Sequence, residues 1–421
     1  MDPATGTGLL MSEIYEIETL TERVLLVGVS ERDGDDAEDS LAELAALAKT
    51  AGAQVVGCVI QRRERIHPGT YVGTGKLEEI RDLLWETDAT GLICDDELSP
   101  AQMKNMEQAL DTKVMDRTLL ILDIFAGRAN TSEGKIQVEL AQLKYRMSRL
   151  TGFGRSMSRL GGGIGTRGPG EKKLETDRRL IGHRAAQLNR ELKEVIRHRE
   201  VNRSQRMKNH TKVAAIVGYT NAGKSTLLNV LTNAQVLEED QLFATLDPTT
   251  RMLQLTKSQQ VLLTDTVGFI RKLPHHLIDA FKSTLEEAKY ADFLIHVVDA
   301  SNPQWDKQMH VVYETLKGLG ITDKRVITLF NKCDRLEEEE IFQDFRAAHT
   351  LRISAKSGMG LDKLKELLEQ ELREGKVLLK HTFPYEQAGE IQRIRKYGEL
   401  LTEDYREDGI YVEAYVPMEL M

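Results

Sequence analysis

A glycine-rich loop in the middle of the chain combines residues that are typical of phosphate binding. Five apolar residues at 213–217 predict a short buried strand, and leucines at 227, 228 and 231 predict a helix after it. The eight residues that follow the strand read Gly-Tyr-Thr-Asn-Ala-Gly-Lys-Ser, which is the pattern G-x-x-x-x-G-K-[ST] in its strand–loop–helix context. Such a backbone curls around an anion, and the helix N-terminus adds a positive partial charge. We therefore expect phosphate contacts from Gly218, Tyr219, Thr220, Asn221, Ala222, Gly223, Lys224 and Ser225.

Two residues of this loop and a second motif predict the chemistry of phosphoryl transfer. Lys224 can reach the β and γ phosphates, and the Ser225 hydroxyl can bind Mg²⁺. A β-branched strand about 40 residues downstream ends at the position where a P-loop enzyme needs a carboxylate that faces Mg²⁺. The glycine three residues later is placed to sense a γ phosphate through its N–H group. This second motif consists of Asp265, Thr266, Val267 and Gly268.

A third motif predicts that the base of the nucleotide is guanine. An apolar strand at 326–330 leads into Asn331, Lys332, Cys333 and Asp334, which match N-K-x-D. Guanine presents N1–H and an exocyclic amine that the Asp334 carboxylate can accept together, whereas adenine presents no such pair of donors. A buried carboxylate that adenine leaves unpaired discriminates by about 10⁴ or more. GTP and GDP, with Mg²⁺, are therefore the expected cofactors. Ser354, Ala355 and Lys356 are expected to support the base with backbone and side-chain contacts.

The composition of the chain excludes several classes of protein. With 421 residues, the chain is long enough for several domains. It has no apolar run long enough to span a membrane, and its first residues lack the basic and apolar regions of a signal peptide. The three cysteines lie far apart, so neither a zinc nor a disulfide spacing results. We expect a protein of the reducing cytoplasm.

Hydrophobic periodicity divides the chain into five segments. Alternating strands and helices predict a small parallel α/β domain, and a change to helical periodicity predicts a long antiparallel helical hairpin after it. The P-loop motifs predict a GTPase domain of the α/β class, and a small α+β domain follows it. The expected ranges are 1–20 for a flexible N-terminus, 21–130 for the parallel α/β domain, 131–210 for the hairpin, 211–375 for the GTPase domain and 376–421 for the α+β domain.

Two stretches of the parallel α/β domain could be taken for sites. Asp95, Asp96 and Glu97 follow a predicted strand, and we interpret them as a solvated loop rather than as a metal site. The run Tyr-Val-Gly-Thr-Gly-Lys-Leu at 71–77 imitates a phosphate loop, but no Ser or Thr follows its lysine. We interpret it as a turn that starts a helix, with nucleotide or nucleic-acid contact as the alternative.

The helical hairpin is strongly basic, although the chain as a whole has a formal net charge of −9. Residues 144–212 contain 19 lysines and arginines and 6 acidic residues. The connector at 151–170 contains eight glycines and no acidic residue. A glycine-rich backbone can approach phosphates closely, arginine neutralises and stacks, and an aromatic ring stacks on a base. The alternatives are a flexible linker and an arm that docks on protein. We predict RNA contact through Phe153, Arg155, Arg159 and Arg167.

The motifs in this order resemble the HflX family of translational GTPases, which is related to the Obg group. The resemblance covers about residues 20–375. It implies a GTPase that binds the large ribosomal subunit and, in several members, splits stalled or stressed ribosomes. It also implies that the hairpin tip reaches ribosomal RNA near the peptidyl transferase centre. The motifs are G-Y-T-N-A-G-K-S, F-A-T-L-D-P-T-T, D-T-V-G-F, N-K-x-D and S-A-K, with T-Y-V-G-T-G-K-L-E-E-I and G-G-G-I-G-T-R-G-P-G-E-K-K-L-E upstream.

The resemblance also implies roles within the threonine-rich link at 243–250. The residues alone leave Thr245, Thr249 and Thr250 open as the switch threonine, and the resemblance implies that Thr245 binds Mg²⁺ when GTP is present. The expected nucleotide contacts then include Phe243, Ala244, Thr245, Leu246 and Asp247. The expected catalytic residues are Lys224, Thr245 and Gly268, and the expected metal ligands are Ser225, Thr245 and Asp265.

One residue departs from the pattern of Ras-like proteins. Phe269 stands where those proteins have the glutamine that orients the attacking water. Phenylalanine cannot form a hydrogen bond with water, so we expect hydrolysis that is slow alone and is accelerated by ribosomes. We expect a monomer that binds ribosomes. A factor that holds precursor ribosomal RNA during assembly of the large subunit is the alternative function.

Overall fold

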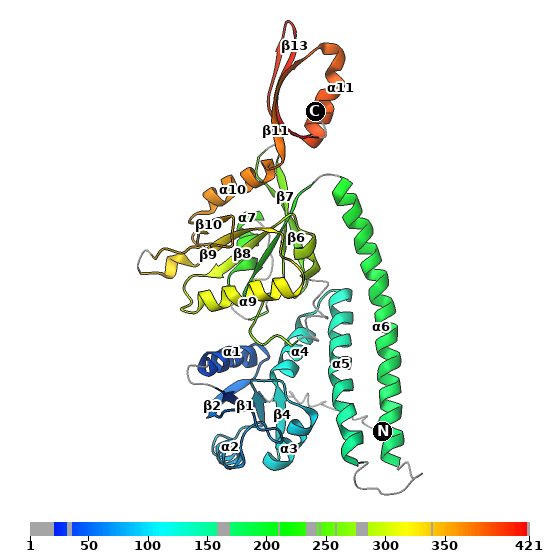
Figure 1. Ribbon diagram of the computed structural model, residues 1–421, viewed down its shortest axis with the longest axis vertical. Helices are drawn as coiled ribbons and strands as arrows, with labels where there is room; N and C mark the ends of the chain where they lie inside the picture. The colour runs from blue at the N-terminus through cyan, green and yellow to red at the C-terminus, as the bar shows by residue number, and fades with distance from the viewer. Residues whose placement is uncertain are drawn as a thin grey trace, which may run out of the picture.

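The β-sheets lie one after another along the long axis of the molecule, and two long helices run beside the lower part (Figure 1). The structure is a computed structural model that describes residues 21–31, 36–157, 169–208, 211–232, 242–243, 246–256, 259–274, 285–337 and 340–418. This part of the chain contains a four-stranded, a six-stranded and a three-stranded sheet. The α/β fold class is confirmed, and the six-stranded sheet contains the strand that leads into the P-loop. The N-terminal segment 1–20, expected to be flexible, lies outside the described residues.

The first sheet is built from four parallel strands with helices between them. Its elements are β1 (Arg23–Ser30), α1 (Ala37–Thr50), β2 (Gln54–Arg62), α2 (Thr74–Glu86), β3 (Gly91–Cys94), α3 (Pro100–Leu110), β4 (Lys113–Asp116) and α4 (Arg117–Arg128). The strand order is β2-β1-β3-β4. Helix α3 begins with a capping box, because Ser99 Oγ accepts from the N–H of Gln102 at 3.2 Å and Gln102 Oε1 accepts from the N–H of Ser99 at 2.9 Å. The run at 71–77 leads into α2, which agrees with a helix-start turn.

Two long helices form the expected antiparallel hairpin (Figure 1). They are α5 (Ser132–Met157) and α6 (Pro169–Lys208). Arg184 of α6 pairs with Glu139 of α5 at 2.7 Å, which adds a charged contact beside the apolar seam. The buried seam consists of Ile136, Leu140 and Leu188, with Leu143, Ala185 and Leu192 beside it.

The connector between these helices is shorter than the range 151–170 that the sequence predicts. Helix α5 continues through Gly152 and Gly154 to Met157, and α6 already begins at Pro169. A glycine costs a helix only about 1 kcal/mol relative to alanine, and a proline is accepted in the first turn. The glycines of the connector therefore do not mark the ends of the helices.

The second sheet has the P-loop at the end of a central strand. Its elements are β5 (Val213–Gly218), α7 (Lys224–Thr232), β6 (Thr249–Gln254), β7 (Gln260–Asp265), β8 (Phe293–Asp299), α9 (Trp305–Gly318), β9 (Arg325–Asn331), β10 (His349–Arg352) and α10 (Leu361–Arg373). The order is β10-β9-β8-β5-β7-β6, with an antiparallel pairing of β6 and β7 and parallel pairings elsewhere. The carboxyl ends of parallel strands meet at one edge of a sheet, so the motifs after β5, β7 and β9 come together there.

The third sheet packs against one helix and is bonded to the GTPase sheet. Its elements are β11 (Lys376–Phe383), α11 (Ala388–Tyr397), β12 (Glu399–Arg406) and β13 (Gly409–Pro417), in the strand order β11-β13-β12. The buried Glu399 pairs with Arg373 of α10 at 2.6 Å and accepts from Gln259 at 2.5 Å. Across the described ranges of the whole chain, no helix has the length and apolar character needed to cross a membrane.

A buried imidazole is expected to make the GTPase sheet sensitive to acid. His296 on β8 is 1% exposed, and its Nδ1 has no hydrogen-bond partner among the described residues. Burial lowers the pKa of His296 to about 4, and the charge of Asp344 opposes this shift only in part. Between pH 6.5 and pH 4, His296 therefore binds a proton in the unfolded chain but stays neutral in the folded chain. The stability that the neutral ring confers is complete above pH 6.5 and is lost as the pH falls towards 4.

We expect His296→Leu to reduce this acid sensitivity. Between pH 7 and pH 4.5 the parent should lose about 2.5 kcal/mol more of its free energy of unfolding than the variant, as measured by urea titration. His310→Leu is the matched control, because His310 is exposed. Equal losses in the parent and in His296→Leu would contradict the prediction.

Candidate nucleotide-binding site

The P-loop has a backbone shape that only glycine permits at two positions. At Gly218 φ is +155°, and a Cβ atom there would lie 2.2 Å from the carbonyl oxygen of Val297. At Gly223 φ is +94°, and a Cβ atom would lie 2.3 Å from Nδ2 of Asn331. Asn331 Nδ2 also donates to the carbonyl oxygen of Ala222 at 2.8 Å. The N-K-x-D motif therefore supports the phosphate loop directly.

Lys224 places a desolvated positive charge at this loop. Its side chain is buried at the start of α7, and Nζ donates to the carbonyl oxygen of Tyr219 at 2.8 Å. Burial lowers the pKa of Lys224 to about 8, and the Asp265 carboxylate opposes that shift in part. An ammonium group in such a low-dielectric place attracts a phosphate strongly.

Ser225 and Asp265 offer oxygen ligands at the carboxyl ends of β5 and β7. Ser225 Oγ donates to Asp265 Oδ2 at 2.7 Å, and Asp265 is fully buried. Mg²⁺ accepts one or two such protein oxygens and takes its other ligands from substrate phosphates and water. In the described ranges, no group of three or more histidine, cysteine and acidic side chains is arranged so that it could hold a metal ion. The two oxygens fit Mg²⁺ that is shared with a nucleotide. Ala244 and Thr245 lie outside the described residues.

Gly268 is held against the P-loop by its neighbour. The N–H of Phe269 donates to the carbonyl oxygen of Gly218 at 3.1 Å, and the N–H of Thr220 donates to that of Phe269 at 2.8 Å. A Cβ atom at Gly268 would lie 2.8 Å from Cα of Thr220 and 3.0 Å from Nζ of Lys224. A side chain at this position would therefore fill the space beside the phosphate loop.

The residues around Gly268 are fixed by burial. Thr266 donates from Oγ1 to the carbonyl oxygen of Ile216 at 2.8 Å. Val267 and Phe269 belong to the same apolar cluster as Tyr219, and Phe269 is 1% exposed. The Phe269 side chain is packed in the interior and has no polar group that could orient water.

The two motifs expected at the base come together at the ends of β9 and β10. Asn331 Oδ1 accepts from the N–H of Ala355 at 2.9 Å. A hydrogen bond from Ser354 lowers the pKa of the Asp334 carboxyl group, which is therefore ionised at neutral pH. Asp334 and Lys356 are exposed, whereas the sequence argument assumed a buried carboxylate. Discrimination between bases therefore requires that the bound base itself covers Asp334.

The residues between Asn331 and Asp334 shape the turn that presents the carboxylate. Lys332 has a φ of +62°, and its ammonium pairs with Asp299 at 2.7 Å. Cys333 is buried, and its Sγ–H donates to the carbonyl oxygen of Phe330 at 3.1 Å. Both side chains are therefore bonded within the GTPase sheet.

Comparison with known proteins assigns this arrangement to a family. Residues 38–126 match the family described as GTP-binding GTPase N-terminal, residues 128–206 match GTP-binding GTPase Middle Region, and residues 213–332 match 50S ribosome-binding GTPase. A protein of Lacrimispora saccharolytica named GTPase HflX is 67% identical over 410 residues, which are 97% of each chain. The chain belongs to the HflX family of GTPases. GTP binding and GTP hydrolysis are its activity.

One further relative and one solved structure are also similar to this chain. The GTPase HflX of Caldanaerobacter subterraneus subsp. tengcongensis is 50% identical and covers 95% of this chain and 92% of its own length. The crystal structure of SsGBP in complex with GDP has a TM-score of 0.47 and 25% identity, and it covers 83% of this chain and 98% of that one. The two HflX relatives confirm the family resemblance that the motifs predicted, over nearly the whole chain.

In this HflX-family chain the threonine-rich link lies against the parallel α/β domain. Phe243 and Leu246 are each 3% exposed. The ring of Phe243 packs edge-on against that of Phe125 on α4, with 4.6 Å between the centroids. The two residues between Phe243 and Leu246, which include Thr245, are therefore flanked by buried anchors on both sides.

Two polar residues of the same link have partners away from the P-loop. The Asp247 carboxylate accepts from the N–H groups of Asn130 and Thr131, at 3.0 and 2.9 Å. Thr250 lies on β6, and its Oγ1 is 3.0 Å from Oγ1 of Thr264. Asp247, expected among the nucleotide contacts, is thus bonded to the segment ahead of α5.

The sequence predicted that the acidic loop after β3 is solvated, but the structure shows that one of its three residues is buried. Asp95 is 2% exposed and pairs with Arg117 at 2.7 Å and with Lys272 at 2.6 Å. Burial raises the pKa of Asp95, but the charges of Arg117 and Lys272 outweigh it and hold the pKa below its usual value. Asp96 also pairs with Lys272, and Glu97 is exposed as expected. The prediction is wrong for Asp95 because its partners lie far away in the sequence.

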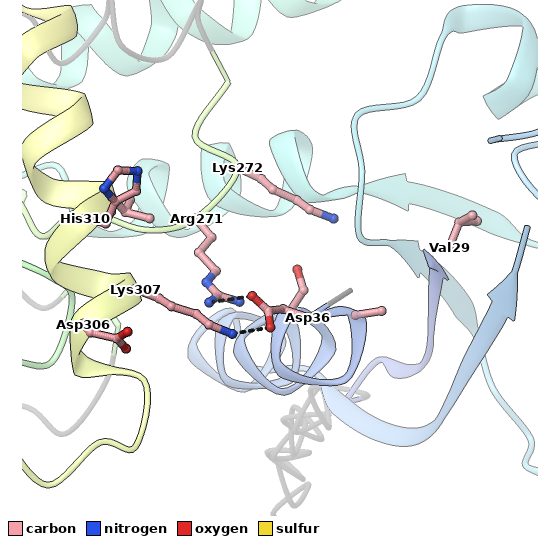
Figure 2. Close-up of a pocket in the computed structure, with 10 residues that line it drawn as sticks. Val29, Asp36, Arg271, Lys272, Asp306, Lys307 and His310 are labelled. Carbon is pink, nitrogen blue, oxygen red and sulfur yellow. Dashed lines mark hydrogen bonds and ion pairs between the residues drawn. The ribbon is translucent and has the colours of Figure 1, made fainter. Parts of the chain in front are cut away.

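Arginine and lysine side chains after the D-T-V-G motif reach the parallel α/β domain (Figure 2). A cleft of about 560 Å³ separates α1 from α9 there. Arg271 and Lys307 both point to Asp36 at the start of α1, with N–O distances of 3.3 and 2.5 Å. The segment after the switch motif and helix α9 are therefore each held to the start of α1 by one ion pair, which no local sequence pattern predicted.

Tyr219 of the P-loop is also bonded to this domain. Its hydroxyl donates to Glu43 on α1 and accepts from the N–H of Arg271 at 2.9 Å. Glu43 in turn pairs with the buried Arg117. Burial raises the pKa of Glu43 and that of Tyr219. The sequence analysis placed Tyr219 at the phosphates but missed Glu43 and Arg117.

The residues expected to contact RNA lie at or beyond the end of α5. Phe153 and Arg155 belong to the last turns of that helix, and the structure describes their backbone only. Arg159 and Arg167 lie outside the described residues. RNA contact by these four residues stays a prediction.

Proposed function

We propose that this chain is a GTP-controlled factor of the cytoplasm that binds the large ribosomal subunit and separates stalled ribosomes into subunits. The observation that carries the proposal is the bonding of the threonine-rich link to the base of a basic helical hairpin. A change of nucleotide at the P-loop can therefore alter the presentation of the hairpin, and a ribosome that prefers one presentation senses the nucleotide. The match of residues 213–332 to a family described as 50S ribosome-binding GTPase supports this partner.

The position of each residue in the nucleotide site determines which part of GTP or Mg²⁺ it binds. Lys224 and the N–H groups of the loop bind the β and γ phosphates and stabilise the charge that develops on them. The N–H of Gly268 faces the γ phosphate and reports its presence. Ser225, Thr245 and Asp265 would hold Mg²⁺, which neutralises phosphate charge when bound. The Asp334 carboxylate accepts the two donors of guanine.

Hydrolysis by the isolated chain should be slow. The side chain after Gly268 is the buried Phe269, which cannot orient a water molecule. We propose that the ribosome accelerates turnover and that hydrolysis then resets the switch. Steady-state turnover should therefore rise when large subunits are added.

Light scattering by purified ribosomes tests the proposed function. GTP and a non-hydrolysable analogue should both support dissociation into subunits, and GDP should not. Equal binding to ribosomes by the empty, GDP-bound and GTP-bound chain would overturn the proposal. If intact ribosomes stay whole and the chain instead co-sediments with immature particles, the alternative role in large-subunit assembly is supported.

The basic tip of the hairpin is expected to supply most of the affinity for RNA. Replacing Arg155, Arg159 and Arg167 together by alanine should weaken binding to large subunits by about 10²-fold or more and lower the slope of log affinity against log salt by about 2 to 3. Alanines in place of the exposed Lys317, Lys363 and Lys365 remove the same charge elsewhere and are the control. Undiminished binding by the tip variant, or binding that survives ribonuclease, would instead indicate a protein-docking arm.

A further inference from the structure

The carboxylate of Asp247 bonds the nucleotide domain to the first helix of the hairpin. It accepts from the N–H groups of Asn130 and Thr131 at 3.0 and 2.9 Å, and from Oγ1 of Thr131 at 2.5 Å. Helix α5 begins one residue later, and the N-terminal end of a helix has unpaired N–H groups and a positive partial charge. A negative side chain from another domain thus completes the start of α5.

A glycine in the first turn of α5 makes room for this contact. A Cβ atom at Gly134 would lie 2.4 Å from Asp247 Oδ1 and 3.1 Å from Thr131 Oγ1. Glycine is otherwise unfavourable in a helix. By contrast, a Cβ atom at Gly127 of α4 would meet no atom within 4 Å. Gly134 is therefore explained by the approach of Asp247, whereas Gly127 is not constrained by any neighbour that the structure describes.

Asp247 is close enough to the switch threonine for the two to move together. It follows Thr245 by two residues, and two residues of extended chain span at most about 7 Å. On the other side of Thr245, Phe243 packs against Phe125 of α4, and α4 and α5 are separated by three residues. The described residues on both sides of positions 244 and 245 are therefore anchored at the junction of α4 and α5, so a rearrangement of this link on nucleotide binding acts on that junction.

We propose that Asp247 is the residue that couples the nucleotide state to the orientation of the helical hairpin. The contact persists in the GDP and GTP states, and α5 follows Asp247 when the bound nucleotide changes. The consequence for ribosome binding rests on the proposed function above. Because coupling between two sites is reciprocal, ribosome binding to the hairpin raises the affinity for GTP relative to GDP by the same factor.

The test compares two variants that break the contact with one that does not. Gly134→Ala acts from α5, outside the GTPase domain, and pushes the carboxylate away. Asp247→Leu removes both acceptor oxygens at a similar size, and Gly127→Ala is the matched control. Spin labels at Lys193→Cys on α6 and Lys317→Cys on α9, in a Cys58→Ala background, report the distance between hairpin and GTPase domain. Both lysines are exposed, as is Cys58, and the other two cysteines are buried.

In the parent and in Gly127→Ala we expect the label distance to differ between GDP and a non-hydrolysable GTP analogue. In Gly134→Ala and Asp247→Leu this difference should disappear, and the ratio of ribosome affinities in the two nucleotide states should fall from about 5-fold or more to within about 2-fold of unity. The proposal would be overturned if the label distance in the parent were the same with both nucleotides. It would also be overturned if the change in label distance persisted in both contact-breaking variants. The distance measurement needs no ribosome, so it can succeed even if ribosome splitting is refuted.

Discussion

Replacing Asp334 by asparagine is expected to weaken GTP binding by about 10³-fold or more and to make xanthosine triphosphate the preferred nucleotide. The hydrogen bond from Ser354 keeps the Asp334 carboxyl ionised at neutral pH, so both of its oxygens accept. Guanine offers two donors to this pair of acceptors. An asparagine amide turns one acceptor into a donor, which then faces the amine of guanine without a partner. Xanthine has an oxygen in place of that amine and restores the match.

Competition binding with a fluorescent guanine nucleotide measures this exchange of preference. Asp323→Asn is the control, because it makes the same chemical change at an exposed site of the same domain. With xanthosine triphosphate the Asp334→Asn variant should hydrolyse at nearly the rate of the parent with GTP, since the phosphate-binding residues are unchanged. If the variant discriminates between the two nucleotides as the parent does, Asp334 does not read the base.

The parts of the site that the sequence predicted are those built from short contiguous motifs. The P-loop, the D-T-V-G motif and the N-K-x-D motif each follow a strand of one parallel sheet, and parallel topology alone brings them to one edge. The glycines at 218 and 223 have the positive φ that the motif demands. Local chemistry was therefore enough to place these groups.

The contacts between domains could not be predicted in this way. Three acidic residues have inter-domain partners more than 70 residues away in the sequence. Asp95 bonds Lys272, Glu43 bonds Tyr219, and Asp247 bonds Asn130 and Thr131. An acidic residue after a strand looks like part of a solvated loop unless the opposing cation is known. The only local hint was Gly134 within the first turn of a helix.

The second large effect is expected at Arg117, where Arg117→Met should destabilise the chain by about 3–5 kcal/mol. Arg117 is 1% exposed and pairs with Asp95 and with Glu43, whose side chains are 3% and 12% exposed. Methionine fills a similar volume but leaves both carboxylates without the guanidinium. Lys272 still partners Asp95, so Glu43 loses the larger share of its stabilisation.

The loss of stability in Arg117→Met should depend on pH, and the direction of this dependence shows whether the unpaired Glu43 carboxylate causes the loss. Burial already raises the pKa of Glu43, and without Arg117 its charged form is less stable still. The pKa of Glu43 is higher in the folded chain than in the unfolded chain, where it is about 4.5. The variant therefore keeps its stability at a pH below 4.5 and loses it as the pH rises through the pKa of the folded state. Urea titrations should therefore show a larger gap between parent and variant at pH 7 than at pH 4.5.

Glu43→Gln in the Arg117→Met background separates a charge effect from a packing effect. The amide stays neutral, so the double variant should regain about 1 kcal/mol or more relative to Arg117→Met and should lose much of the pH dependence. Arg393→Met removes an arginine from an exposed pair with Glu390 and should change the stability little. Because Glu43 also bonds Tyr219 of the P-loop, the same rescue should restore nucleotide affinity. Restored stability without restored affinity would mean that Glu43 supports the fold but not the phosphate loop.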